Sequence, residues 1–177
     1  MSAAALNVLD NNENGFFLMI EGGAVDWAGH ANQSGRVIEE QMDFNAAVQT
    51  VLAWVKKNSN WGETLLVVTG DHETGYLVGP GSGTIAGTAT FKPIIDNGPG
   101  TLPGMQWDSD NHTNQLIPLF AKGKASVLLK GAANGRCRPT RPHDSKAGPL
   151  FKWAVDGSDP VRGKYIDNTD LGRILID

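Results

Sequence analysis

Four features that this 177-residue chain lacks limit what it can be. Its single cysteine, Cys137, excludes an internal disulfide. No apolar run approaches the ~20 residues of a membrane-spanning helix, and residues 1–15 lack the basic and apolar regions of a signal peptide. The net charge of −4 gives the chain no overall basic character, and we expect neither a membrane nor nucleic acid as a binding partner.

Glycine, in contrast, is abundant. Glycine accounts for 22 of the 177 residues, about 12%, whereas its average share in proteins is about 7%. This excess predicts many tight turns and close backbone approaches. Hydrophobic residues make up 40% of the chain and charged residues 19%, which is typical of a soluble globular protein. The length fits one domain with a sizeable core.

Two short apolar runs on either side of an amphipathic segment predict a βαβ unit. The runs Gly15–Ile20 and Thr64–Thr69 are continuous and apolar, as in strands buried on both faces. From about Arg36 to Lys57 the apolar residues recur with helical spacing. They are Phe44, Val48, Val51, Leu52 and Val55. We therefore expect an α/β fold in which the two strands are parallel neighbours in one sheet.

The segments that follow this unit are less regular. Residues 79–106 are rich in Gly, Pro and Thr, which indicates a long surface excursion. Leu116–Ala121 is a further candidate strand, and Pro118 favours an edge or a bulge there.

Residues 131–149 are turn-rich and basic without periodicity, and we interpret them as a flexible insertion. His143 lies within this insertion, where we expect it to be solvent-exposed. The chain should end on a short helix that reaches Leu175, with Asn168 or Thr169 as its cap.

Three candidate metal ligands follow the first predicted strand within ten residues: Glu21, Asp26 and His30. In open α/β sheets, sites lie at the carboxyl ends of strands. Asp26 and His30 are four residues apart, so both side chains can reach one ion if this segment makes a helical turn. The competing interpretation is a solvated acidic loop with an unrelated histidine.

The second predicted strand ends in the same way, with Asp71 and His72. An oxygen and a nitrogen ligand at this position suit zinc or a similar ion, and two parallel strands would deliver them to the same sheet edge. His112 precedes the third candidate strand, where a lone histidine could equally be a capping or surface residue. Three of the four histidines thus fall in polar segments at predicted strand ends.

These motifs resemble those of the alkaline phosphatase family. Residues 16–30 (FFLMIEGGAVDWAGH) are similar to its E-G-x-x-x-D-x-x-x-H pattern, and residues 67–72 (VVTGDH) are similar to its V-T-x-D-H pattern. Residues 111–113 (NHT) resemble its H-T or H-A-G segment, which also precedes a strand. The order and spacing agree from about residue 15 to 125, and residues 159–169 also look like bacterial members.

The resemblance implies a fold and a set of metal ligands. The chain would be the C-terminal, metal-binding part of a single alkaline-phosphatase-like domain, contributing to a mostly parallel central sheet with flanking helices. Asp26, His30 and His112 take the places of the first zinc's ligands, and Asp71 and His72 take two places at the second zinc. Glu21 takes the place of a magnesium ligand. Two zinc ions would clamp the phosphate of a phosphate monoester substrate.

Several features depart from the family pattern. The family's serine nucleophile lies in an Asp-Ser-Ala segment well upstream of the first motif, so we expect no catalytic residue within this chain. Ser145 follows every metal motif, within the predicted insertion, and we reject it as the nucleophile. An upstream bridging aspartate, the other magnesium ligand and the phosphate-binding arginine have no counterpart either. Trp27 stands where some branches carry Lys or His and others carry Trp, so a cation that assists phosphate binding is absent at this position.

Two other interpretations remain open. The chain could be a non-catalytic metal-binding protein, or another metal-dependent phosphoesterase or phosphomutase of the same superfamily. The glycine pair after Glu21 favours the phosphatase. The resemblance also implies a periplasmic or secreted protein, and either a homodimer or a complementing N-terminal segment as a partner.

Overall fold

A computed structural model describes residues 1–85, 88–113, 115–133, 166 and 168–176. The chain divides into two compact units, which are described separately. Unit 1 comprises Met1–Thr64 and Thr74–His112, and unit 2 comprises Leu65–Glu73 and Thr113–Asp177. The boundary passes through two short strands, β2 (Glu73–Thr74) and β7 (His112–Thr113).

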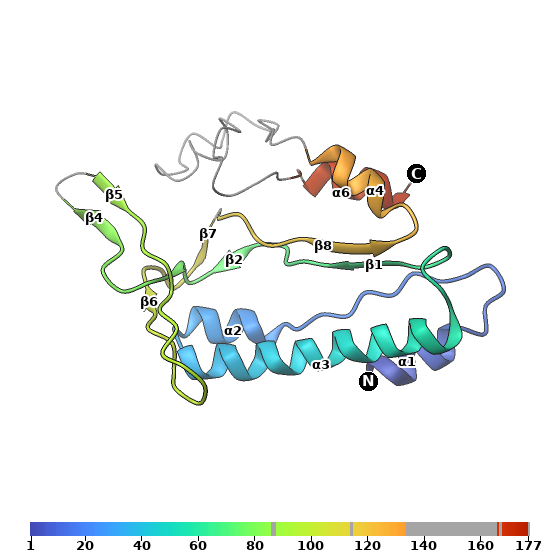
Figure 1. Cartoon of the computed structure of the whole chain (residues 1–177), viewed down its shortest axis with the longest axis horizontal. Helices are drawn as coiled ribbons and strands as arrows, with labels where there is room; N and C mark the ends of the chain where they lie inside the picture. The colour runs from blue at the N-terminus through green and yellow to red at the C-terminus, as the bar shows by residue number, and fades with distance from the viewer. Residues whose placement is uncertain (86–87, 114, 134–165, 167, 177) are drawn as a thin grey trace. The chain divides into compact units, whose positions relative to one another are not determined.

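Three helices form the body of unit 1 (Figure 1): α1 (Ser2–Leu9), α2 (Ala24–His30) and α3 (Ser34–Asn58). Both α1 and α2 pack against α3, and Leu6 of α1 and Val55 of α3 are almost fully buried. Lys56 and Lys57 lie in the last turn of α3, where positive charge is favourable. The helix expected from about Arg36 to Lys57 is therefore confirmed, with slightly wider bounds.

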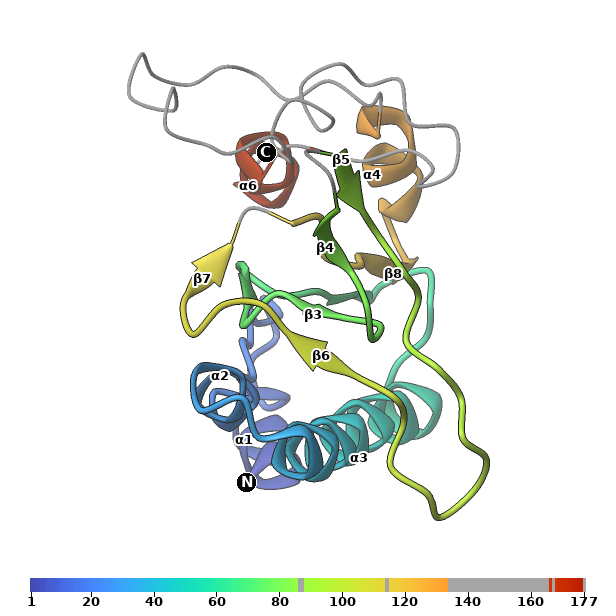
Figure 2. The same ribbon diagram turned by 90° about the vertical axis from the view of Figure 1, so that its left-hand side faces the viewer.

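Short antiparallel ladders complete unit 1. Strand β3 (Leu77–Val78) pairs with β6 (Gln106–Trp107), as Figure 2 shows, and β4 (Gly83–Ile85) pairs with β5 (Thr88–Thr90). The Trp107 indole N–H donates to Ser34 Oγ at 2.8 Å, which ties β6 to the start of α3. The segment between β3 and β6, where a surface excursion was predicted at residues 79–106, contains the β4–β5 ladder.

Unit 2 contains one ladder and two helices. Strand β1 (Leu65–Val68) pairs antiparallel with β8 (Phe120–Gly123), with Leu65 opposite Gly123 and Val68 opposite Phe120. Helix α4 (Ser126–Ala132) contacts both β8 and α6 (Asn168–Ile176), and Leu129 of α4 is buried. The C-terminal helix predicted from the sequence is thus present.

The strand predicted at Gly15–Ile20 is not formed. This run has no regular secondary structure, and the side chains of Phe17 and Met19 are 77% and 76% exposed. An apolar run becomes a strand only where neighbouring strands accept and donate its backbone hydrogen bonds, and the structure shows no such ladder along this described segment. The β1–β8, β3–β6 and β4–β5 ladders are all antiparallel, so the parallel central sheet stays a prediction.

The later segments of the chain differ in how far the structure tests their predictions. The strand predicted at Leu116–Ala121 begins later, at Phe120, after Pro118 has removed one backbone donor. Most of the predicted insertion at residues 131–149, with His143 and Ser145, lies outside the described residues. Among the described residues, no helix has the length and apolar character needed to cross a membrane.

Candidate metal centre

Helix α2 carries two of the predicted ligands on one face. Asp26 lies in its first turn and His30 is its last residue, so the helical turn required by their spacing is present. The distance from Asp26 Oδ2 to His30 Nε2 is 3.6 Å. Their side chains are about one-third exposed, at 34% and 37%, which leaves both accessible to an ion. Just before α2, the backbone at Gly22 packs closely against Phe44 of α3. A Cβ atom added at Gly22 would lie only 2.9 Å from the Phe44 ring.

His112 reaches the same place as the first residue of β7, and the residues just before it are hydrogen-bonded to the backbone of Gly75. The amide of Gly75 donates to the Asn111 carbonyl at 3.0 Å, and the amide of Ser109 donates to the Gly75 carbonyl at 3.1 Å. The amide of His112 donates to Asn111 Oδ1 at 2.9 Å. These bonds fix the backbone that carries His112 without using its imidazole.

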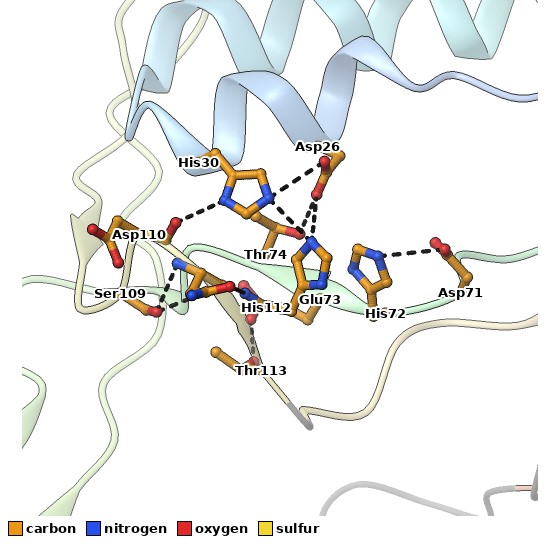
Figure 3. Close-up of polar contacts among 11 residues, drawn as sticks. Asp26, His30, Asp71, His72, Glu73, Thr74, Ser109, Asp110, His112 and Thr113 are labelled. Atoms are coloured by element: carbon orange, nitrogen blue, oxygen red, sulfur yellow. Dashed lines mark hydrogen bonds and ion pairs between the residues drawn. The ribbon is translucent and has the colours of Figure 1, made fainter.

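Asp26, His30 and His112 converge within unit 1, and we call them the ligand triad (Figure 3). The two imidazole Nε2 atoms are 3.1 Å apart, and His112 Nε2 is 3.5 Å from Asp26 Oδ1. Ligands about 2.0–2.1 Å from a tetrahedral zinc lie about 3.3 Å from one another. The donor separations of 3.1 to 3.6 Å are close to that value, so the triad fits a zinc-sized ion.

Two contacts around the triad orient its members. His30 Nδ1 lies 2.7 Å from the carbonyl oxygen of Asp110, which can only accept, so Nδ1 carries the proton. In a neutral imidazole this leaves the lone pair of His30 Nε2 facing Asp26 and His112. This arrangement is typical of a metal-bound histidine. The hydroxyl of Thr74 donates to Asp26 Oδ1 at 2.5 Å.

The other predicted ligands are arranged as follows. In unit 2, His72 Nε2 lies 3.4 Å from Asp71 Oδ2, and the Asp71 side chain is 89% exposed. Glu21 is exposed just before α2, and its carboxylate lies near Gly23. Among the contacts described for unit 1, none joins Glu21 to the ligand triad.

Two participants were missed by the sequence analysis. Thr74 follows the Asp71-His72 motif closely, but a threonine hydroxyl has no distinctive spacing that would mark it as a partner of Asp26. The Asp110 contact uses a backbone carbonyl, which every residue has. A search for hydroxyl residues just after the second motif could have found Thr74, whereas no sequence signal could have found the carbonyl.

Comparison with known proteins defines the class to which this arrangement belongs. A family model described as alkaline phosphatase matches residues 1–98, more than half of the chain. Alkaline phosphatase H of Pseudomonas aeruginosa is 31% identical over 133 residues, covering 74% of this chain and 27% of that protein. Alkaline phosphatase of Escherichia coli is 32% identical over 137 residues, covering 74% of this chain and 28% of that protein.

A solved structure supports the same conclusion. A mutant of TAB5 alkaline phosphatase with Mg bound in its M3 site is 35% identical, with a TM-score of 0.52 over 69% of this chain and 33% of that one. The chain belongs to the alkaline phosphatase family, and the fold of its matching part is alkaline-phosphatase-like. It spans less than a third of the length of the curated bacterial relatives described above.

Proposed function

We propose that this chain supplies metal ligands to a zinc- and magnesium-dependent alkaline phosphatase that hydrolyses phosphate monoesters. The observation that carries this proposal is the convergence of one carboxylate and two imidazoles in the ligand triad, at separations suited to zinc. Family membership adds the reaction class.

Each predicted ligand has a role in this proposal. Asp26, His30 and His112 would hold the first zinc, with the Asp110 carbonyl keeping the His30 lone pair available. Asp71 and His72 would contribute to the second zinc, and Glu21 to magnesium. The related TAB5 mutant, which was solved with magnesium, supports a magnesium site in relatives of this chain. When bound, such metals polarise phosphoryl oxygens and stabilise both the entering and leaving oxygens.

The remaining parts of the active site would come from outside the 177 residues. No Asp-Ser-Ala segment occurs in the sequence, so we propose that the serine nucleophile and the phosphate-binding arginine belong to another segment of the complete enzyme. That segment, or a second chain, would also pair with the apolar run Gly15–Ile20 and complete a parallel sheet. A homodimer and a periplasmic or secreted location complete the proposal by analogy with the family.

Hydrolysis of an aryl phosphate tests this function. The isolated chain, loaded with zinc and magnesium, should be slower than a complete relative by orders of magnitude, because catalytic residues that act as a unit lose most of their effect together. Adding the N-terminal part of the Pseudomonas aeruginosa relative should raise the rate. If no such part restores turnover while metal binding persists, the chain is a non-catalytic metal-binding protein instead. A high rate from the chain alone, abolished by Ser145→Ala, would contradict the assignment of the nucleophile.

A further inference from the structure

Thr74 is packed directly against the face of α2 that carries Asp26. A Cβ atom at Gly29 would lie 3.2 Å from the Cβ, the Cγ2 and the carbonyl oxygen of Thr74. Gly29 is buried, so the missing side chain at this position is what allows the threonine to approach the helix so closely. Asp26 and Gly29 are three residues apart and therefore lie on the same side of α2.

From this position the Thr74 hydroxyl fixes one oxygen of the Asp26 carboxylate. It donates to Oδ1 at 2.5 Å, in a part-buried environment (Figure 3). A carboxylate otherwise rotates broadly about its terminal torsion. With Oδ1 held, Oδ2 faces His30 Nε2 at 3.6 Å, and Oδ1 itself lies 3.5 Å from His112 Nε2. The hydroxyl thus sets the direction in which Asp26 can coordinate.

We propose that Thr74 is a positioning residue of the ligand triad, which orients Asp26 for metal binding without touching the metal. The inference rests on the proposed function, because it presumes that the triad binds zinc. Outer partners of metal ligands typically contribute 10- to 100-fold to metal affinity, since they restrict the ligand to its coordinating orientation. We expect an effect of that size here.

Two substitutions separate orientation from packing. Thr74→Val keeps the shape of the side chain and its contact with Gly29 but removes the hydroxyl. Thr74→Ser keeps the hydroxyl but removes the methyl group that packs on α2. If Thr74 acts only through packing, valine should preserve zinc affinity and serine should weaken it. If it orients Asp26, the outcome is reversed.

Zinc affinity can be measured on the full chain by competition with a chromogenic chelator. We expect Thr74→Val to bind zinc about 10- to 100-fold more weakly and Thr74→Ser to stay within about 3-fold of wild type. Thr50→Val is a matched control, because it also removes a threonine hydroxyl, one that donates to the Ala46 carbonyl within α3 at 3.0 Å. That control should bind zinc as wild type does.

The outcomes distinguish this inference from the proposed function. Wild-type affinity in Thr74→Val, or equal weakening in the valine and serine variants, would overturn the role of Thr74. Absence of zinc binding by the wild-type chain would instead refute the metal centre itself. If Thr74→Val does not fold, Thr74→Ala removes the same hydroxyl and should show the same loss, again with Thr74→Ser as the rescue.

Discussion

At Gly75 the backbone has a φ of +90°, and the residue lies between the two histidine-bearing segments of the triad. An added Cβ would come within 2.5 Å of the Trp107 ring and 2.9 Å of the Gly29 carbonyl oxygen. The amide of Gly75 also donates to Asn111, next to His112. Glycine is therefore required here for two separate reasons, a left-handed backbone and the absence of space.

Substitution of Gly75 tests both reasons. Gly75→Ala should destabilise the chain by more than about 3 kcal/mol, since the left-handed strain of roughly 1–2 kcal/mol is joined by a clash with Trp107. Gly98→Ala is the matched control: Gly98 has a similar φ of +86° but nothing within 4 Å of its Cβ position. Gly98→Ala should therefore lose only the roughly 1–2 kcal/mol of unfolding free energy that corresponds to the left-handed strain. Urea unfolding gives both free energies, and equal losses in the two variants would contradict the packing described around Trp107.

At this scale the sequence singled out the three residues that the structure brings together in the ligand triad, and their role as metal ligands stays a prediction. The four-residue spacing of Asp26 and His30 predicts their convergence, because a helical turn is the common way to use that spacing. Placing His112 beside them needed the family resemblance, since a lone histidine before a strand is ambiguous. Thr74 and the Asp110 carbonyl could not be predicted, because their contacts depend on how distant backbone segments pack.

At the scale of elements, α3 is the support on which α1 and α2 are packed. Its apolar stripe has clear helical periodicity, which explains why the sequence predicted it within a few residues. Leu6 is the main buried contribution of α1, at 2% exposure, whereas Val8 on the same helix is 72% exposed.

This difference gives a prediction for α1. Leu6→Ala should cost about 2–5 kcal/mol of unfolding free energy, because it removes buried methyl groups and leaves a cavity against α3. Val8→Ala should change stability by less than about 0.5 kcal/mol, as for other exposed positions. Denaturant unfolding followed by tryptophan fluorescence measures both. A similar cost for the two variants would mean that α1 is not docked on α3 through Leu6.

The run Gly15–Ile20 shows where sequence patterns are insufficient. Its composition is that of a buried strand, but strand formation depends on partners elsewhere, and its side chains Phe17 and Met19 are exposed. In contrast, a helix satisfies its backbone hydrogen bonds internally. Helices α3 and α6 were accordingly predicted, although α1 and α4 were not. The strand expected at Thr64–Thr69 is present as β1, but its pairing is antiparallel.

At the scale of the whole molecule, phosphatase activity and metal binding by the triad make different demands on the chain. The chain belongs to the alkaline phosphatase family, but it spans only 27% and 28% of the two curated bacterial relatives compared above. Under the proposed function, phosphatase activity requires further residues, among them the serine nucleophile. The proposed metal binding by the triad, in contrast, would use residues of unit 1 alone.

A zinc titration of the ligand triad tests the proposed metal centre. The purified chain, His30→Ala and His112→Ala would each be titrated with zinc, with His143→Ala as a histidine-to-alanine control outside the predicted ligand set. Each triad variant should bind zinc more than about 100-fold more weakly than wild type, since even outer partners of ligands contribute 10- to 100-fold. The His143→Ala control should match wild type. Unchanged zinc affinity in both triad variants would contradict the proposed metal centre.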